Sequence, residues 1–414
     1  MQTFTGFEYL LIDAANQMGH DKWLFEQRIN WALEHIDELD TMVCTEKTAP
    51  QFRKAVMAIN EARRGEPSGH LVGFDACCSG MQIMSALTGC VDGAAATNLI
   101  NTGVRQDAYT LVTDAASMAL GESVGEIKRA AIKTATMTHL YGSKAEPKKL
   151  FGEDTPELAA FYEGIDVVCP GANELLQDLI QSWQAYQEVH EWVLPDNYHA
   201  RVKSMELVEC RVEVDEMDHA TFEHSYKVQC GVEFAVKNAA NVIHSIDAYI
   251  LRSMQRRCNY NSVVVRGALD ILLEEMDFRG YGEAIPVNGN KAEAIEVYLD
   301  LYNRTNMVDA VILPHLTRSN VECVETDHIE ALIRLCESML AHPPFELITV
   351  HDEFKCHANY CNYMRQHYID IFAELADSNI IDDIFFQITG SHVSYANSNP
   401  GLSEMIRNSE YALS

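Results

Sequence analysis

Two short apolar runs, far apart in the chain, each lead to an aspartate, and this pair constrains the fold more than any other feature. The first run, residues 71–74, is followed by Asp75, and the second, residues 345–350, is followed by His351 and Asp352. Short apolar runs are typical of buried strands, so each aspartate is expected at the mouth of a sheet. Two such carboxylates can share a pair of divalent metal ions, and Mg²⁺ prefers one or two carboxylates together with substrate phosphates. The pattern therefore indicates two-metal nucleotide chemistry.

A cationic helix is predicted between the two aspartates. Arg129, Lys133, Met137 and Tyr141 follow one another at intervals of four, and Gly142 comes next. This spacing places the four side chains along one face of a helix over residues 126–140, which contains neither proline nor glycine. Arginine as a rigid fork and lysine as a mobile point charge suit a triphosphate. The ring and hydroxyl of the tyrosine suit a sugar or a base.

Each of these residues has an ordinary structural explanation when it is taken alone. A single aspartate at the end of a strand is more often a turn former than a ligand. Arg129 and Lys133 could form a solvated helix face, and Met137 could fill a core. Tyr411, close to the last residue, could lie in a frayed tail. The pairing of Asp75 with Asp352, with a cationic helix between them, favours the functional interpretation.

The ordered set of motifs resembles the single-subunit RNA polymerases of phages and mitochondria. Three segments resemble that family's first metal motif, fingers helix and second metal motif: Asp75-x3-Ser79-Gly80-x-Gln82-x2-Ser85-Ala86, Arg129-x3-Lys133-x7-Tyr141-Gly142 and His351-Asp352-x-Phe354. Four more agree with it: Ala15-Asn16-x2-Gly19-x-Asp21-Lys22 with Arg28, Gln106-Asp107-x-Tyr109, Val242-Ile243-His244-Ser245-x-Asp247, and Ile406-x2-Ser409-Glu410-Tyr411-Ala412. The resemblance spans almost the whole chain except residues 257–341.

The resemblance implies an α+β, helix-rich fold with the palm and fingers of a right-hand polymerase, and without a thumb or an N-terminal domain. The implied domains are a first palm part (1–95), fingers (96–243), a junction helix (244–258), an inserted helical subdomain (259–341) and a second palm part with the C-terminal tail (342–414). Hydrophobic periodicity predicts helices over residues 23–39, 98–119, 175–189, 234–256, 291–302 and 327–340, and alternation predicts a hairpin within 198–230.

The resemblance also implies roles for individual residues. Asp75 and Asp352 are expected to hold two Mg²⁺ ions, with the backbone carbonyl of Ala76 as a further ligand. Together with these two aspartates, Lys133 and Tyr141 are the implied catalytic residues. The implied substrate-binding residues are Arg129, Met137, Gly142, His244 and His351.

The implied activity is DNA-directed RNA synthesis in phage transcription, and two alternatives stay open. Met137 stands where related DNA polymerases have an aromatic residue, which favours RNA synthesis. Glu353 follows Asp352 where RNA polymerases usually have serine, which favours DNA synthesis. Glu353 is either a third carboxylate near the metals or a side chain on the other face of the turn. A degenerate, non-catalytic scaffold subunit is the second alternative.

Net charge runs against nucleic-acid binding, because the chain carries a formal charge of −30. Residues 128–149 are nevertheless locally basic. The acidic surplus gathers in two clusters, Glu206, Glu209, Glu213, Asp215, Glu216 and Asp218 in one and Asp270, Glu274, Glu275 and Asp277 in the other. These clusters are either solvated faces or docking sites for a basic partner.

The expected partners follow from what the chain lacks relative to the family. It contains no Asp-x-x-Gly-Arg motif, and it most resembles the large subunit of the split RNA polymerases of lytic podoviruses. A second polypeptide that supplies thumb and N-terminal elements is therefore expected, besides DNA template, RNA product and rNTPs. The segment before Trp192 is short for the family's promoter-reading hairpin, so a single-stranded DNA-binding accessory factor is a further expected partner. No signal peptide or membrane span is indicated, and the infected bacterial cytoplasm is the expected location.

Overall fold

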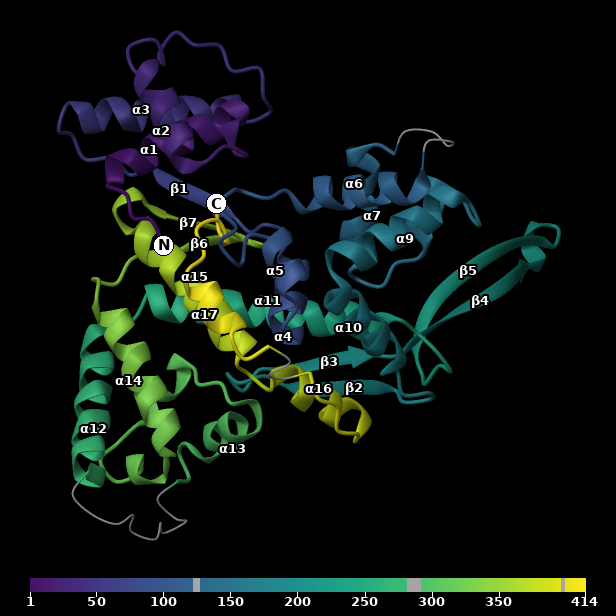
Figure 1. Ribbon diagram of the computed structural model, residues 1–414. Helices are drawn as coiled ribbons and strands as arrows, with labels where there is room; N and C mark the ends of the chain where they lie inside the picture. Colours follow the sequence, from purple (N-terminus) through teal and green to yellow (C-terminus); the bar gives the residue numbers. More distant parts are fainter. Residues whose placement is uncertain (122–126, 281–291, 396–398) are drawn as a thin grey trace.

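The computed structural model describes residues 1–121, 127–280, 292–395 and 399–414, and within these ranges it is helix-rich with three small antiparallel sheets (Figure 1). The predicted α+β, helix-rich class is confirmed, and its division into palm and fingers stays a prediction. No helix of the described part has the length and apolar character needed to cross a membrane.

The N-terminal layer consists of three helices above the sheet that carries Asp75 (Figure 1). They are α1 (Gly6–Ala15), α2 (Phe25–Glu34) and α3 (Ala49–Arg63). The helix predicted over 23–39 is real but shorter. Arg28 of α2 is fully buried and donates hydrogen bonds to the Asn16 side chain and to the carbonyl oxygens of Asp21 and Trp23. Arg28 therefore holds the loop after α1 in place and does not reach the solvent.

The sheet beneath this layer joins segments from both ends of the chain. Its strands are β1 (Leu71–Asp75), β7 (Glu353–His357) and β6 (Ile348–Val350), in the antiparallel order β1-β7-β6. Val72 and Phe74 of β1 and Phe354 and Cys356 of β7 are buried, so one face of the sheet packs on the core. The second predicted strand begins at Ile348 rather than at residue 345.

Two helices directly after β1 and five further along form the region before residue 182. They are α4 (Ser79–Thr88), α5 (Val91–Ala96), α6 (Ala108–Leu120), α7 (Arg129–His139), α8 (Ala145–Phe151), α9 (Pro156–Val168) and α10 (Pro170–Gln181). The helix predicted over 98–119 is wrong over residues 98–107, nearly half of its length, because the Asp107 side chain accepts a hydrogen bond from Tyr109 N and caps α6 there. The cationic helix is confirmed as α7, although residue 126 lies outside the described residues.

The helix predicted over 175–189 is wrong at its end. It stops at Gln181, and Val189 already opens strand β2 (Val189–Val193), which pairs with β3 (His199–Lys203). The reason is tertiary packing, because Trp192 is buried and donates to Ser245 Oγ on α11 (Lys237–Cys258). That helix crosses the molecule beneath the sheet, as Figure 1 shows.

Residues 262–340 have a hydrophobic core separate from the main one. It is built by α12 (Ser262–Gly280), α13 (Glu296–Thr305) and α14 (Thr326–Leu340). Helices were predicted over 291–302 and 327–340. The second is confirmed, whereas the first is wrong at its start, because the helix begins at Glu296; residue 291 lies outside the described residues. The existence of a second core agrees with an inserted subdomain, whose boundaries remain a prediction.

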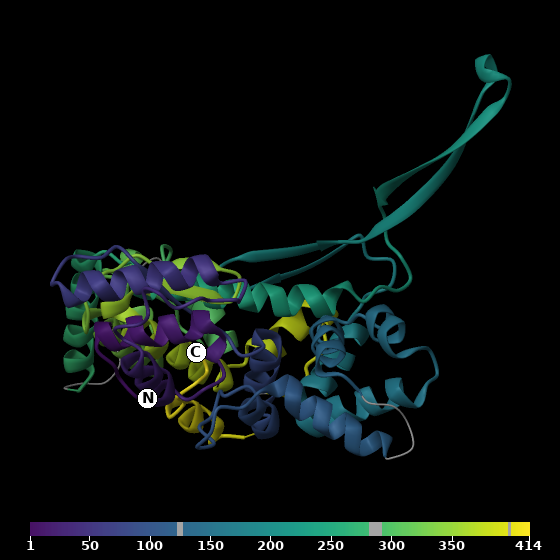
Figure 2. The ribbon, with the colours of Figure 1, turned by 90° about the horizontal axis from the view of Figure 1, so that it is seen from above.

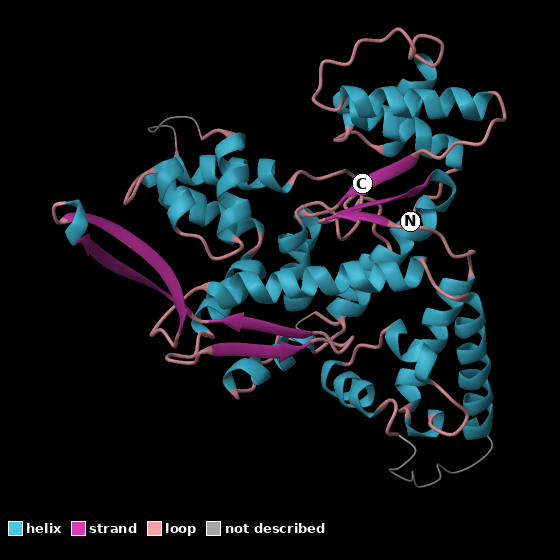
Figure 3. Cartoon of the chain, turned by 180° about the vertical axis from the view of Figure 1, so that it is seen from behind, coloured by secondary structure: helices cyan, strands magenta, loops and turns pink. Residues whose placement is uncertain are grey.

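The last helices return the chain to the sheet. They are α15 (Cys361–Ala376), α16 (Ile380–Thr389) and α17 (Leu402–Arg407). Leu413 then bridges to Ala76, and the C-terminal residue lies beside the sheet, as Figure 3 shows from behind. Tyr411 stacks on Phe25 at 4.7 Å and accepts a hydrogen bond from Phe25 N, so it is not in a frayed tail.

The β4–β5 hairpin projects from the body as a long arm (Figure 2). Its strands, β4 (Met205–Val214) and β5 (Ala220–Gln229), pair over their full length from Met205↔Gln229 to Val214↔Ala220. The hairpin predicted within 198–230 is thereby confirmed.

A buried histidine pair predicts acid sensitivity of the fold. His367 of α15 lies 2.7 Å from His342, nitrogen to nitrogen, and burial, followed by the nearby Arg257, holds its pKa well below the usual value. A histidine whose pKa is lower in the folded state favours folding while it is neutral, and that contribution is lost as pH falls below the unfolded pKa of about 6.5. The melting temperature should therefore fall between pH 7.5 and 5.5, and less so in His367→Gln. The exposed His199→Gln is the control, and an unchanged pH slope in His367→Gln would contradict the assignment.

Candidate active site

A cavity of about 570 Å³ opens where β1 ends and β7 begins. The predicted site residues that line it are Asp75, Ala76, Lys133, Met137, Tyr141, His244, His351 and Asp352. They come from four separate places: the β1–α4 turn, α7 and the residues just after it, α11, and the β6–β7 turn. Two predicted residues, Arg129 and Gly142, are not among the lining residues.

The two aspartates lie at adjacent strand ends. Asp75 is the last residue of β1, and the amide of the next residue, Ala76, donates to the carbonyl oxygen of Asp352 at 3.2 Å. Burial in the first place, and the negative charges of Asp352 and Glu353 in the second, raise the pKa of Asp75 to about 6. Carboxylates crowded in this way repel one another, and a bound cation relieves that repulsion. The donor set is all oxygen and thus fits Mg²⁺.

Glu353 lies on the cavity side of the sheet. It is paired directly opposite Asp75, so both side chains emerge on the same face. Its carboxylate forms an ion pair with Lys355 at 2.8 Å. A Cβ at residue 73 would lie 2.7 Å from Glu353 Oε1, so the glycine there makes room for the carboxylate. The sequence left two positions open for the Glu353 side chain, near the metals or on the other face of the turn. The structure shows it on the same face as Asp75.

The cations of α7 are held by α6. Arg129 forms an ion pair with Asp107 at 2.5 Å and also donates to Thr110, so its guanidinium is turned toward α6. Lys133 faces the cavity with its Nζ 5.4 Å from the ring centroid of Tyr109. Its positive charge lowers the pKa of Asp75, against the larger effect of burial. Lys133 is thus the α7 cation that already faces the aspartates.

An aromatic pair lies at the end of α7. The rings of Tyr141 and His244 stack at 4.4 Å with an interplanar angle of 6°. Burial raises the pKa of Tyr141 to about 12, so its hydroxyl stays protonated and can donate. A Cβ at Gly80 would lie 3.3 Å from that hydroxyl. Gly142 has a φ of 85°, which favours glycine and lets the chain turn between α7 and α8.

The cavity also contains residues that were not predicted as site residues. Three of them, Asp107, Tyr109 and Asp247, lie in segments that resemble family motifs. That resemblance could have predicted them as site residues. Burial, followed by the negative charge of Asp352, raises the pKa of Asp247 to about 6. No local pattern marks Ser414, whose amide donates to the carbonyl oxygen of Asp75 at 3.1 Å. Its contact depends on the tertiary fold alone.

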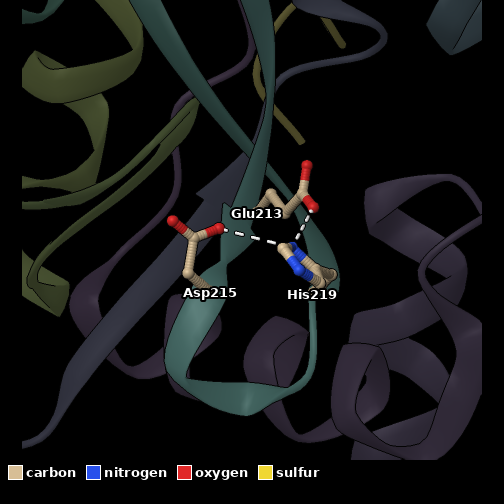
Figure 4. A group of neighbouring side chains, drawn as sticks. All are labelled: Glu213, Asp215 and His219. Carbon is tan, nitrogen blue, oxygen red and sulfur yellow. Dashed lines mark hydrogen bonds and ion pairs between the residues drawn. The ribbon is translucent and has the colours of Figure 1, made fainter.

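A different set of side chains comes closest to the geometry of a metal site. In the described part of the chain, Glu213, Asp215 and His219 are the trio whose ligand atoms all lie within 4.8 Å of one another. They lie at the tip of the β4–β5 hairpin and are exposed, and His219 Nδ1 contacts both carboxylates (Figure 4). An exposed acidic cluster of this kind is common without a metal, so it does not replace the predicted site.

Comparison with known proteins gives one match. Residues 2–149 match the family described as DNA-dependent RNA polymerase. This range includes Asp75, Lys133 and Tyr141, whereas His244 and Asp352 lie beyond it. No curated protein matches the chain. This part of the chain is therefore similar to an enzyme family of DNA-dependent RNA polymerases, and the match supports nucleotidyltransferase activity.

Proposed function

We propose that the cavity is the nucleotidyl-transfer site and that Asp75 and Asp352 hold two Mg²⁺ ions there. The observation that carries the proposal is the meeting of these two aspartates, from distant segments, opposite Lys133 in one cavity. When bound, the ions supply charge stabilisation for the attacking and leaving oxygens. The carbonyl oxygen of Ala76 is a candidate further ligand.

The side chains around the aspartates have separate tasks in this proposal. Lys133 binds the triphosphate and stabilises the charge that develops on the leaving pyrophosphate. Arg129, whose guanidinium is oriented by its ion pair with Asp107, contributes a second cation to the triphosphate. Met137, Gly142 and His351 shape the nucleotide-binding surface.

The stacked pair of Tyr141 and His244 is proposed to recognise the ribose. The Tyr141 hydroxyl is protonated and lies at the cavity wall, so it can hydrogen-bond a 2′-hydroxyl. A site built around that hydroxyl rejects deoxynucleotides, because a nucleotide without the 2′-hydroxyl leaves a polar group of the protein unpaired. Glu353, in this reading, adds negative charge beside the metals and does not by itself specify deoxynucleotides.

We further propose that the chain works in phage transcription with a second polypeptide that supplies thumb-like contacts to the template. The net charge of −30 supports this partner, since phosphate contacts provide most nucleic-acid affinity. Purification of the complex from its native host, followed by primer extension with rNTPs with and without Mg²⁺, tests both parts. Processive RNA synthesis by the isolated monomeric chain would contradict the partner, and no Mg²⁺-dependent extension by the complex would contradict the site.

Removal of the sugar contact should alter nucleotide choice. In Tyr141→Phe the ring stack with His244 remains but the hydroxyl is lost, so the preference for rNTPs over dNTPs should fall about tenfold. The ratio of kcat/KM for ATP and dATP measures it. Tyr162→Phe, on the partly exposed face of α9, is the matched control. An unchanged ratio in Tyr141→Phe would remove this residue from sugar recognition.

Loss of the clamp on Arg129 should weaken nucleotide binding. Asp107→Asn keeps a side chain able to cap α6 but removes the charge that orients the guanidinium. The KM for nucleotides should rise several-fold to about tenfold, with a smaller change in kcat, because one oriented cation contact is weakened. Steady-state kinetics on a primed template provides the measurement. A lower KM would show instead that Asp107 competes with the substrate for Arg129.

A further inference from the structure

The β4–β5 hairpin is the largest feature of the molecule that the proposed chemistry does not use. Figures 1 and 2 show it leaving the body beyond β2 and β3. Its sheet consists of these two strands alone within the described ranges, so both long edges and both faces are uncovered. A two-stranded ribbon of this kind is only marginally stable in water. The uncovered edges and faces of the hairpin are therefore available for contact with a partner.

The two faces of the hairpin differ in character. Side chains alternate along each strand, and residues paired directly opposite share a face. The register places eight apolar side chains on one face, together with Glu206 and His224: Val208, Cys210, Val212, Val214, Ala220, Phe222, Tyr226 and Val228. The other face carries Glu209, Arg211, Glu213, Glu223 and Lys227, besides Leu207 and smaller polar residues. The hairpin is thus an amphipathic ribbon.

The apolar face is open to solvent rather than packed on the protein. Phe222 is 52% exposed, Tyr226 is 45% exposed and Val212 is 38% exposed. Contiguous apolar surface of this kind, rimmed by charge, marks an interaction site. The rim is provided by Glu206 near the base and by Asp215, Glu216 and Asp218 at the tip.

The charge of the hairpin selects the kind of partner. Residues 205–229 contain seven carboxylates against two Lys or Arg side chains, a net charge of −5. Nucleic-acid phosphates are repelled by this balance, and so is a second copy of a chain whose net charge is −30. A protein segment that is basic and has apolar side chains on one side complements both the charge and the ribbon.

We propose that the hairpin is a docking arm for a basic, extended protein segment in which apolar residues alternate with Lys or Arg. The apolar side chains cover the face around Phe222 and Tyr226, and the cations pair with the acidic rim. Backbone pairing along the free edge of β4 or β5 can extend the ribbon by one strand. This role is separate from nucleotidyl transfer and does not depend on it.

Binding of defined peptides to the full-length chain tests the proposal. The probe is a short fluorescent peptide that alternates lysine and valine, and its control has the same composition with the lysines and valines in two blocks. The face variant is Val212→Ser with Phe222→Ser, a cross-strand pair on the apolar face. The matched control is the neighbouring cross-strand pair on the other face, Arg211→Ser with Glu223→Ser, and neither double variant changes the net charge.

The alternating peptide should bind the wild type and the Arg211/Glu223 variant at least about tenfold more tightly than the block peptide, and the Val212/Phe222 variant should lose that difference. If the wild type bound both peptides equally, or if the Val212/Phe222 variant bound the alternating peptide as tightly as the wild type does, charge alone would explain the binding. Either result would overturn the proposal. If the wild type bound duplex DNA and the Val212/Phe222 variant did not, the hairpin would be a DNA-binding element instead. A dimer by light scattering that the face variant abolishes would make the occupant a second copy.

Discussion

Asp75→Asn and Asp352→Asn should each reduce nucleotide addition by about 1,000-fold or more while the protein stays folded. Asparagine keeps the size of the side chain but removes the charge that holds two divalent cations, and those cations carry the largest share of transition-state stabilisation in phosphoryl transfer. The loss of charge also relieves the repulsion that raises the pKa of Asp75. The melting temperature of either variant should therefore be unchanged or higher.

Single-nucleotide addition to a primed template, measured at several Mg²⁺ concentrations, provides the rate. Asp114→Asn, an exposed carboxylate on α6, is the matched control and should act like the wild type. A variant at residue 75 or 352 that retains more than about a tenth of the wild-type rate cannot have lost a metal ligand of this importance.

Lys133→Gln should lower kcat/KM for nucleotides by about 100-fold, the order found for loss of one preorganised charged contact to a developing anion. Lys133 is the α7 cation that faces the aspartates, and within the described part of the chain it forms no ion pair with a carboxylate. Lys128→Gln, an exposed lysine one residue before α7, is the control. An effect of similar size in both variants would indicate general attraction of nucleotides rather than a contact at residue 133.

The local parts of the site could be predicted because their determinants lie close together in the sequence. Each aspartate ends a short apolar run, and the intervals of four between Arg129 and Tyr141 fix one helix face. The start of α6 was missed because a single side chain, Asp107, decides it by capping, and the hydrophobic periodicity continues through the loop before it. The end of α10 was missed because burial of Trp192 against α11 favours a strand.

Other features of the site depend on contacts between distant segments and leave no local pattern. The spacing on α7 cannot reveal that Arg129 turns to Asp107 whereas Lys133 faces the cavity. The face on which Glu353 lies follows from its register with Asp75, and that register depends on pairing between strands far apart in the sequence. The hairpin was visible as alternation, but its projection from the body was not.

The pairing of β1 with β7 also determines at what stage of synthesis the site can form. Asp75 leaves the ribosome about 280 residues before Asp352, which at roughly 5–20 residues per second corresponds to a delay of some tens of seconds. During that time β1 is an unpaired edge, and such edges are prone to aggregation. Nascent chains and C-terminal truncations therefore cannot assemble the pair of aspartates. Yield of active enzyme should depend on how well β1 is protected during synthesis, which slower growth or a chaperone that binds exposed strands would improve.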